Sequence, residues 1–132
     1  MKVLFSANVM KAGGKVEEGL ASNMLITFNE DAPEDYLDYV LTINNIIYDS
    51  TELQKNAVYI LQINNQYWDV TCWGDATWKN LCELGHMTVI FDGAETPVAY
   101  GSLHVKGNCT PSMNDLAGQL VILRSIHENS SD

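Results

Sequence analysis

The three histidines of this chain are its best candidates for acid–base, nucleophilic or metal-binding chemistry, and they are far apart in the sequence. His86, His104 and His127 are separated by 18 and 23 positions, which is not the short spacing of a metal-ligand motif. No nucleophile elbow, phosphate-binding glycine loop or dinucleotide fingerprint occurs either, and Gly13-Gly14 predicts only a turn. We therefore predict no catalytic residue, no metal and no cofactor, and a protein that is not an enzyme.

The three cysteines also lack a chemical motif. Cys72, Cys82 and Cys109 are odd in number, and none is paired in the C-x-x-C spacing of a zinc site. We expect free, mostly buried thiols in a reducing compartment, although a hairpin could also bring Cys72 and Cys82 together as a disulfide.

Aromatic residues are concentrated in residues 67–78, which contain Tyr67, Trp68, Trp73 and Trp78. Strand alternation would turn Trp68 toward a core and place Tyr67 and Trp73 on the opposite face, whereas Trp78 falls in the loop that follows. Exposed aromatic side chains stack on sugars or anchor protein interfaces. We therefore predict that Trp78, with Trp73 and Tyr67, contacts a partner.

Carboxylates are concentrated in residues 30–38. They are Glu30, Asp31, Glu34, Asp35 and Asp38. Several oxygen ligands could gather a calcium ion, but the stretch lacks the ligand order of an EF-hand. A solvated acidic loop is the simpler interpretation, and it makes Glu34, Asp35 and Asp38 candidates for binding a basic protein surface. Whether the loop binds calcium or such a surface stays open.

The whole-chain composition indicates one folded domain. The chain has 132 residues, 46% of them hydrophobic, and its 7 basic and 17 acidic residues give a net charge of −10. So few Lys and Arg residues exclude a phosphate-backbone site for nucleic acid, and the negative charge disfavours anionic membranes. The N-terminal apolar stretch is too short for a signal peptide, and no window is long enough for a transmembrane helix. We expect a cytoplasmic protein, or a virion protein if the chain is viral.

Hydrophobic alternation predicts a succession of short β-strands. The predicted strands are residues 2–10, 23–29, 37–43, 46–50, 57–63, 66–73, 86–92 and 97–105. Two Asn-Asn pairs, in the similar stretches 39–50 and 59–70, predict hairpin turns, as does Asp92-Gly93. The fold class is therefore all-β, an antiparallel β-sandwich over residues 1–108.

The C-terminal segment, residues 109–132, departs from this strand rhythm. Ser112 and Asp115 resemble a helix capping box. Four apolar residues follow at the spacing of a heptad seam: Met113, Leu116, Leu120 and Leu123. The continuous apolar run 120–123 equally predicts a strand, so helix and strand both stay open for residues 113–126. Because more apolar residues are present than one face needs, we expect these four residues to assemble the chain into a homo-oligomer.

One stretch resembles a known family. Residues 84–93 (Leu-Gly-His-Met-Thr-Val-Ile-Phe-Asp-Gly) and 100–105 (Tyr-Gly-Ser-Leu-His-Val) resemble the closing hairpin of bacterial and phage immunoglobulin-like domains. The resemblance implies an immunoglobulin-like β-sandwich that serves as an assembly or adhesion module. Our leading hypothesis is therefore a viral structural protein that acts by protein–protein interaction. The alternatives are an acidic inhibitor (an immunity or anti-defence protein) that binds a basic nucleic-acid-binding site, and a carbohydrate-binding module.

Overall fold

The computed structural model describes residues 1–125, so His127 lies outside the described residues. Its strands and helices, in chain order, are β1 (Lys2–Ala12), α1 (Val16–Ala21), β2 (Met24–Phe28), the 3-10 helix η1 (Glu34–Tyr39), β3 (Val40–Tyr48), β4 (Tyr59–Ile63), β5 (Gln66–Trp73), α2 (Thr77–Leu84), β6 (Met87–Ile90), β7 (Ser102–Lys106), the 3-10 helix η2 (Met113–Asp115) and β8 (Gln119–Arg124).

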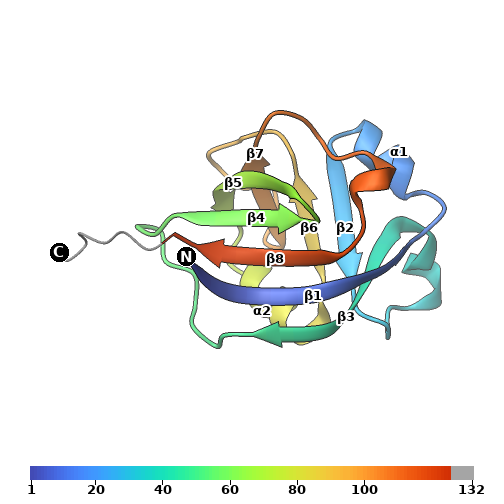
Figure 1. Cartoon of the computed structure of the whole chain (residues 1–132), viewed down its shortest axis with the longest axis horizontal. Coiled ribbons are helices and arrows are strands. Elements are labelled where there is room, and N and C mark those ends of the chain that lie inside the picture. Colours follow the sequence, from blue (N-terminus) through green and yellow to red (C-terminus); the bar gives the residue numbers. More distant parts are fainter. Residues whose placement is uncertain (126–132) are drawn as a thin grey trace.

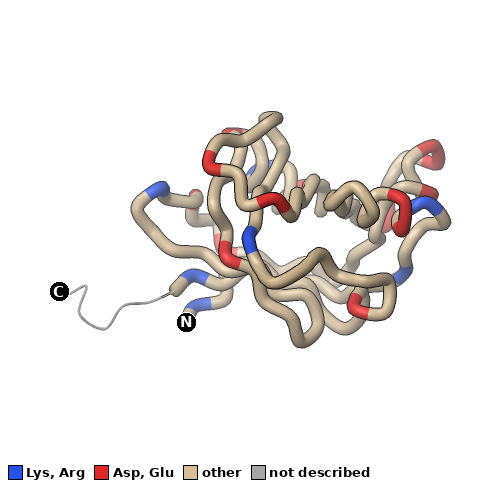
Figure 2. The backbone as a smooth tube through the Cα atoms, turned by 90° about the horizontal axis from the view of Figure 1, so that it is seen from above, with Lys and Arg blue, Asp and Glu red and all other residues tan. Residues whose placement is uncertain are grey.

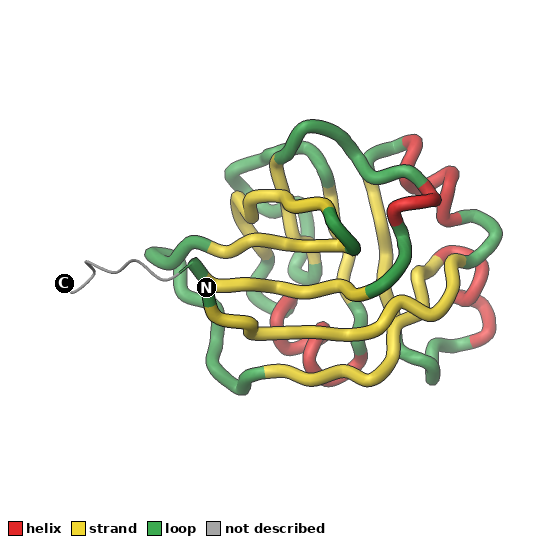
Figure 3. The backbone as a smooth tube through the Cα atoms, viewed as in Figure 1, coloured by secondary structure: helices red, strands yellow, loops and turns green. Residues whose placement is uncertain are grey.

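The strands form one closed barrel in the order β1-β3-β2-β6-β7-β5-β4-β8 (Figure 1). The β2–β3 and β6–β7 pairs are parallel, and the other pairs are antiparallel. The helices lie outside the ring of strands (Figure 3). The predicted all-β class is confirmed, whereas the predicted antiparallel sandwich is wrong, because long loops before β3 and β7 let these strands return in parallel.

The two Asn-Asn pairs have different structures. Asn64, with φ at 55°, makes the turn of the predicted β4–β5 hairpin, in which Ile63 faces Gln66. Asn45, with φ at 51°, lies inside the continuous strand β3, where the pairing with β1 shifts register. Asn tolerates a positive φ in both settings, so the same sequence pattern produces a hairpin turn in one place and a bulge in the other.

The barrel contains two copies of one structural unit, residues 2–48 and 66–106. In each copy a strand leads through a glycine into a short helix, a second strand, a long loop and a third strand. The third strand pairs in parallel with the second and antiparallel with the first. Gly13 N–H donates to the Val40 carbonyl at 3.0 Å, and Gly74 N–H donates to the Ser102 carbonyl at 2.9 Å. The Asp92-Gly93 hairpin is therefore wrong, because residues 91–101 form the long loop of the second copy.

The two long loops pass directly over the two glycines. A Cβ atom at Gly13 would strike the backbone of residues 37–38, and a Cβ atom at Gly74 would strike the backbone of residues 99–100. Only glycine leaves room for so close an approach of one backbone to another. The matching contacts indicate that the loops 29–39 and 91–101 occupy equivalent places in the barrel.

The C-terminal apolar run forms a barrel strand. β8 pairs with β1 on one side and β4 on the other, so the strand alternative for this segment is found and the helix alternative is not. The Ser112–Asp115 capping box is present, although it begins only the short helix η2. Three of the four residues expected to drive assembly, Leu116, Leu120 and Leu123, are buried within the chain, and Met113 is half-buried against the core. These side chains therefore contribute first to the barrel's own core.

Candidate functional site

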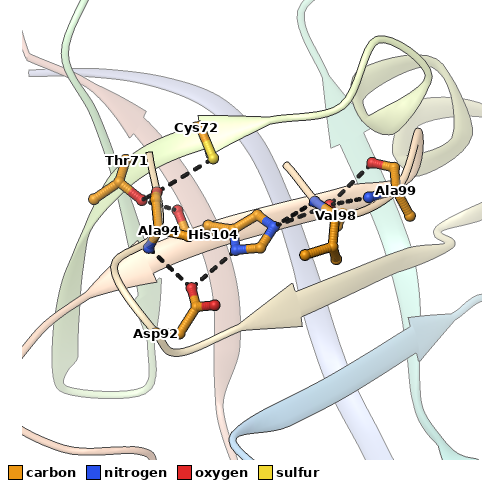
Figure 4. Close-up of polar contacts among 8 residues, drawn as sticks. Thr71, Cys72, Asp92, Ala94, Val98, Ala99 and His104 are labelled. Carbon is orange, nitrogen blue, oxygen red and sulfur yellow. Dashed lines mark hydrogen bonds and ion pairs between the residues drawn. The ribbon is translucent and has the colours of Figure 1, made fainter. Parts of the chain in front are cut away.

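His104 is a buried histidine on the barrel wall (Figure 4). It lies on β7 opposite Cys72 of β5, and its exposed fraction is 0%. Its Nδ1 lies 2.8 Å from Oδ1 of Asp92, and its Nε2 lies 3.2 Å from the backbone nitrogen of Val98. Since Val98 N–H is a donor, Nε2 carries the lone pair and Nδ1–H donates to the carboxylate. Both ring nitrogens are therefore occupied by loop 91–101.

The carboxylate of Asp92 is held by the backbone as well as by the histidine. Partial burial raises the pKa of Asp92, but hydrogen bonds from Ala94 N–H (3.0 Å) and the His104 ring outweigh it, so the pKa lies below its usual value of 3.8. The ionised form of Asp92 is thus the one that fits the site.

Ser102, His104 and Asp92 have the connectivity of a nucleophilic triad. Ser102 Oγ lies 3.2 Å from Nε2 of His104, but it also donates to the Ala99 carbonyl at 3.0 Å. Ser102 is only 1% exposed, so no substrate reaches its hydroxyl. A triad acts when its serine is free to attack a substrate. Here the hydrogen bonds of Ser102, His104 and Asp92 hold loop 91–101 in place instead. In the described structure these three residues therefore have a positioning role.

Two further side chains from β5 hold the same loop. Thr71 Oγ1 donates to the Ala94 carbonyl at 2.5 Å, and Cys72 Sγ donates to the same carbonyl at 3.3 Å. Burial, together with the negative charges of Asp92 and Glu95, raises the pKa of the Cys72 thiol. The thiol is therefore protonated and inert at neutral pH. No disulfide joins the described cysteines, so the alternative Cys72–Cys82 bridge is not formed.

His86 is in a more open setting. It follows α2, its ring is half-buried against Phe28 at a centroid separation of 4.7 Å, and its Nδ1 lies 3.3 Å from the Thr27 carbonyl. Since a carbonyl only accepts, Nδ1 carries a proton, and in the neutral ring Nε2 then carries the lone pair. Of the two described histidines, His104 has both ring nitrogens in protein hydrogen bonds, whereas Nε2 of His86 has no protein partner within residues 1–125.

The aromatic residues singled out by the sequence do not share one exposed face. Trp78 lies on α2 and is only 8% exposed, with its ring packed edge-on against Phe5, so the expected exposure is not found. Trp73 is half-buried, and Trp68 lies in the core as predicted. Tyr67 remains exposed at 59%. Of the three candidate contact residues, only Tyr67 is fully available to a partner.

The acidic stretch is only partly an irregular loop, because the 3-10 helix η1 begins at Glu34, after Glu30 and Asp31. Glu34, Asp35 and Asp38 lie exposed on η1, beside the exposed rings of Tyr36 and Tyr39. Within residues 1–125, no group of three or more His, Cys, Asp or Glu side chains is arranged to hold a metal ion. No helix in this part of the chain is long and apolar enough to cross a membrane.

The barrel fold of this chain is shared by a protein of known structure. It is similar to the crystal structure of a PTS system IIA component from Enterococcus faecalis V583, with a TM-score of 0.65 and 19% sequence identity over 92% of this chain and 99% of that one. At this identity the likeness shows the fold alone.

The sequence then identifies the family. The family model described as "PTS system glucitol/sorbitol-specific IIA component" matches residues 4–121, and the chain belongs to this family. Relatives from Shigella flexneri and Escherichia coli (strain K12), each named "PTS system glucitol/sorbitol-specific EIIA component", are 32% identical to it over 132 residues, covering 97% of this chain and 100% of each relative.

This membership corrects the resemblance and the functions inferred from it. The immunoglobulin-like resemblance of residues 84–105 is wrong, because these residues contain a parallel pair of barrel strands. The viral structural protein, the acidic inhibitor and the carbohydrate-binding module are wrong as well. The family model matches residues 4–121, whereas the resemblance rested on a short local motif of low specificity.

Proposed function

We propose that the chain is the IIA component of a sugar phosphotransferase system (PTS) for a hexitol, which receives a phosphoryl group from a donor protein and passes it to a sugar-specific partner. The observation that carries this proposal is the family match over residues 4–121, supported by relatives that align over their full length. The role belongs in the cytoplasm, and it makes the chain a carrier that exchanges groups with proteins rather than a classical enzyme.

A carrier of this kind needs a nucleophile that a protein donor can reach. An imidazole is suited to it when a hydrogen bond fixes the proton on one nitrogen and leaves the lone pair of the other free. In the transfer, a nitrogen–phosphorus bond forms on the carrier while the bond from phosphorus to the donor breaks, and the donor leaves unphosphorylated.

The two described histidines differ in how well they meet this need. Nε2 of His104 carries a lone pair, but the ring is 0% exposed beneath loop 91–101. Nε2 of His86 also carries a lone pair, and that ring is only half-buried. His86 is therefore the first described residue to test as the acceptor.

The charge of the chain fits a protein partner with a basic surface. Figure 2 shows Asp and Glu on several loops and helices, with few Lys or Arg between them, in keeping with the net charge of −10. Such a field speeds the encounter with a basic partner and repels nucleic acid.

The test is phosphoryl uptake by the full chain from phosphoenolpyruvate and the two general proteins of the phosphotransferase system. We expect one acid-labile phosphoryl group by intact-mass spectrometry, and its loss in His86→Gln but not in His104→Gln. Uptake that persists in His86→Gln and disappears in His127→Gln would move the acceptor to His127. A wild-type chain that takes up no phosphoryl group would overturn the carrier role.

A further inference from the structure

Loop 91–101 exposes apolar side chains to an unusual degree. Val98 is 71% exposed and Tyr100 is 78% exposed, and these are the two most exposed large apolar side chains among residues 1–125. They are two positions apart in the exposed loop segment 97–100, which we call the ridge. Contiguous apolar patches exposed on a soluble protein mark sites of protein contact, and Val98 and Tyr100 line the same hollow.

The ridge is held rigidly although its side chains are exposed. Its backbone is fixed at three successive residues: Val98 N–H donates to His104 (3.2 Å), Ala99 N–H donates to Ser102 (3.3 Å), and the Tyr100 carbonyl accepts from Ala76 N–H (2.9 Å). A surface already ordered before binding loses little conformational entropy when a partner covers it. The buried His104 site therefore serves to present the ridge.

Two hollows border the ridge, and an acidic side chain lies in both. One hollow, of about 390 Å³, is lined by Asp75 and by the ridge itself. The other, of about 320 Å³, is lined by Asp75, Pro97, Glu95 and Lys55, among others. Asp75 is exposed. A cationic side chain set beside an apolar patch would complement this arrangement.

The ridge also lies at the end of the β6–β7 pair where His86 is found. Thr88 faces Ser102 in the parallel register. Tyr100 precedes Ser102 by two residues, and His86 precedes Thr88 by two residues. A partner seated on the ridge would therefore approach the end of the barrel that carries the more open histidine.

We propose that residues 97–100 are the docking surface for the phosphoryl donor protein, whose contact face combines an apolar patch with a neighbouring Lys or Arg that pairs with Asp75. The apolar patch of the donor protein would cover Val98 and Tyr100 of this chain. Tyrosine is among the residues that dominate interface energies. This inference rests on the proposed function for the identity of the partner.

The experiment measures the affinity of the full chain for the purified donor protein by titration calorimetry. We expect Tyr100→Ala and Val98→Asp each to weaken binding about tenfold or more. Matched controls are Tyr48→Ala, an exposed tyrosine on β3, and Ile47→Asp, whose exposed fraction of 70% is one percentage point below that of Val98. Both controls should bind as the wild type does.

Asp75→Asn tests the proposed pairing of Asp75 with a Lys or Arg of the donor protein. It should weaken binding at low salt and reduce the dependence of affinity on salt, whereas Asp69→Asn on β5 should do neither. All variants change exposed residues, so thermal unfolding should confirm that each is folded.

The outcomes separate the two proposals. Donor binding that is unchanged in Tyr100→Ala and Val98→Asp overturns the docking surface and leaves the carrier role standing. Equal losses in the matched controls overturn the surface as well. Self-association of the wild type that Tyr100→Ala abolishes would assign the ridge to a second copy of the chain and overturn donor docking. A wild-type chain that neither binds the donor nor takes up phosphoryl overturns both.

Discussion

At the scale of single residues, His104 joins three parts of the second structural unit. Its ring lies on β7, accepts from Val98 in the loop and donates to Asp92 at the loop's beginning. A buried donor or acceptor that loses its partner costs the desolvation energy of that group. The ring thus stabilises the loop by accepting from Val98 N–H and by adding a second hydrogen bond to the Asp92 carboxylate, which also accepts from Ala94 N–H.

Replacing this histidine should therefore cost stability. We expect His104→Ala to lower the free energy of unfolding by about 2–4 kcal/mol, because it opens a cavity and strands Val98 N–H beneath the loop. Urea denaturation followed by circular dichroism measures the change. His86→Ala, at a half-buried position, should cost clearly less, and equal losses would contradict the role assigned to His104.

Asp92 gives the site a dependence on pH. Its pKa is lower in the folded chain than its usual value of 3.8, so its contribution is present above that value and is lost as the pH falls through the folded pKa. We expect the stability of the wild type to decline below about pH 4, and Asp92→Asn to show a shallower decline. Chemical denaturation at several pH values measures both slopes. Asp35→Asn, on the exposed η1, serves as the control, and a wild-type slope in Asp92→Asn would refute the assignment.

At the scale of elements, local pattern predicted the strands better than their pairing. Strand alternation and the pair Asn64-Asn65 were enough to predict the β4–β5 hairpin, because its turn and its strands are adjacent in the sequence. Asp92-Gly93 carries the same kind of turn signal, and Gly93 does take a positive φ of 66°. The chain nevertheless continues across the barrel, because Gly74 on a distant segment lets the loop pack over it. No local window contains that contact.

The two crossing glycines provide a test of this explanation. Gly74→Ala should destabilise the barrel by about 2 kcal/mol or more, because its Cβ would strike the carbonyls of Ala99 and Tyr100, which are backbone atoms and cannot rotate away. Gly13→Ala should behave alike in the first unit. Gly14→Ala meets nothing within 4 Å and is the control. Thermal unfolding measures all three, and a harmless Gly74→Ala would contradict the equivalence of the two loops.

At the scale of the whole molecule, the candidate site depends on contacts between distant residues. The sequence identifies His86 and His104 as chemically capable, but their spacing says nothing of Asp92, Thr27 or Phe28, which decide what each ring can do. The exposed apolar ridge is equally hidden, since Val98 and Tyr100 fall where alternation predicted a strand. Composition did indicate an acidic chain, because net charge needs no knowledge of the fold.

Because the barrel is closed, removing the C-terminal segment should affect strands that are far from it in the sequence. Deleting residues 112–132 removes β8, the strand that joins β1 to β4, and leaves the edges of both strands unpaired. The core also loses Leu120 and Ile122, which are almost fully enclosed. We therefore expect the truncated chain to be unfolded, by circular dichroism and by loss of cooperative melting, rather than a folded monomer released from an oligomer. Deleting only residues 126–132 keeps every described strand and should preserve folding. A folded, cooperative protein lacking residues 112–132 would show that the barrel does not need β8 to close.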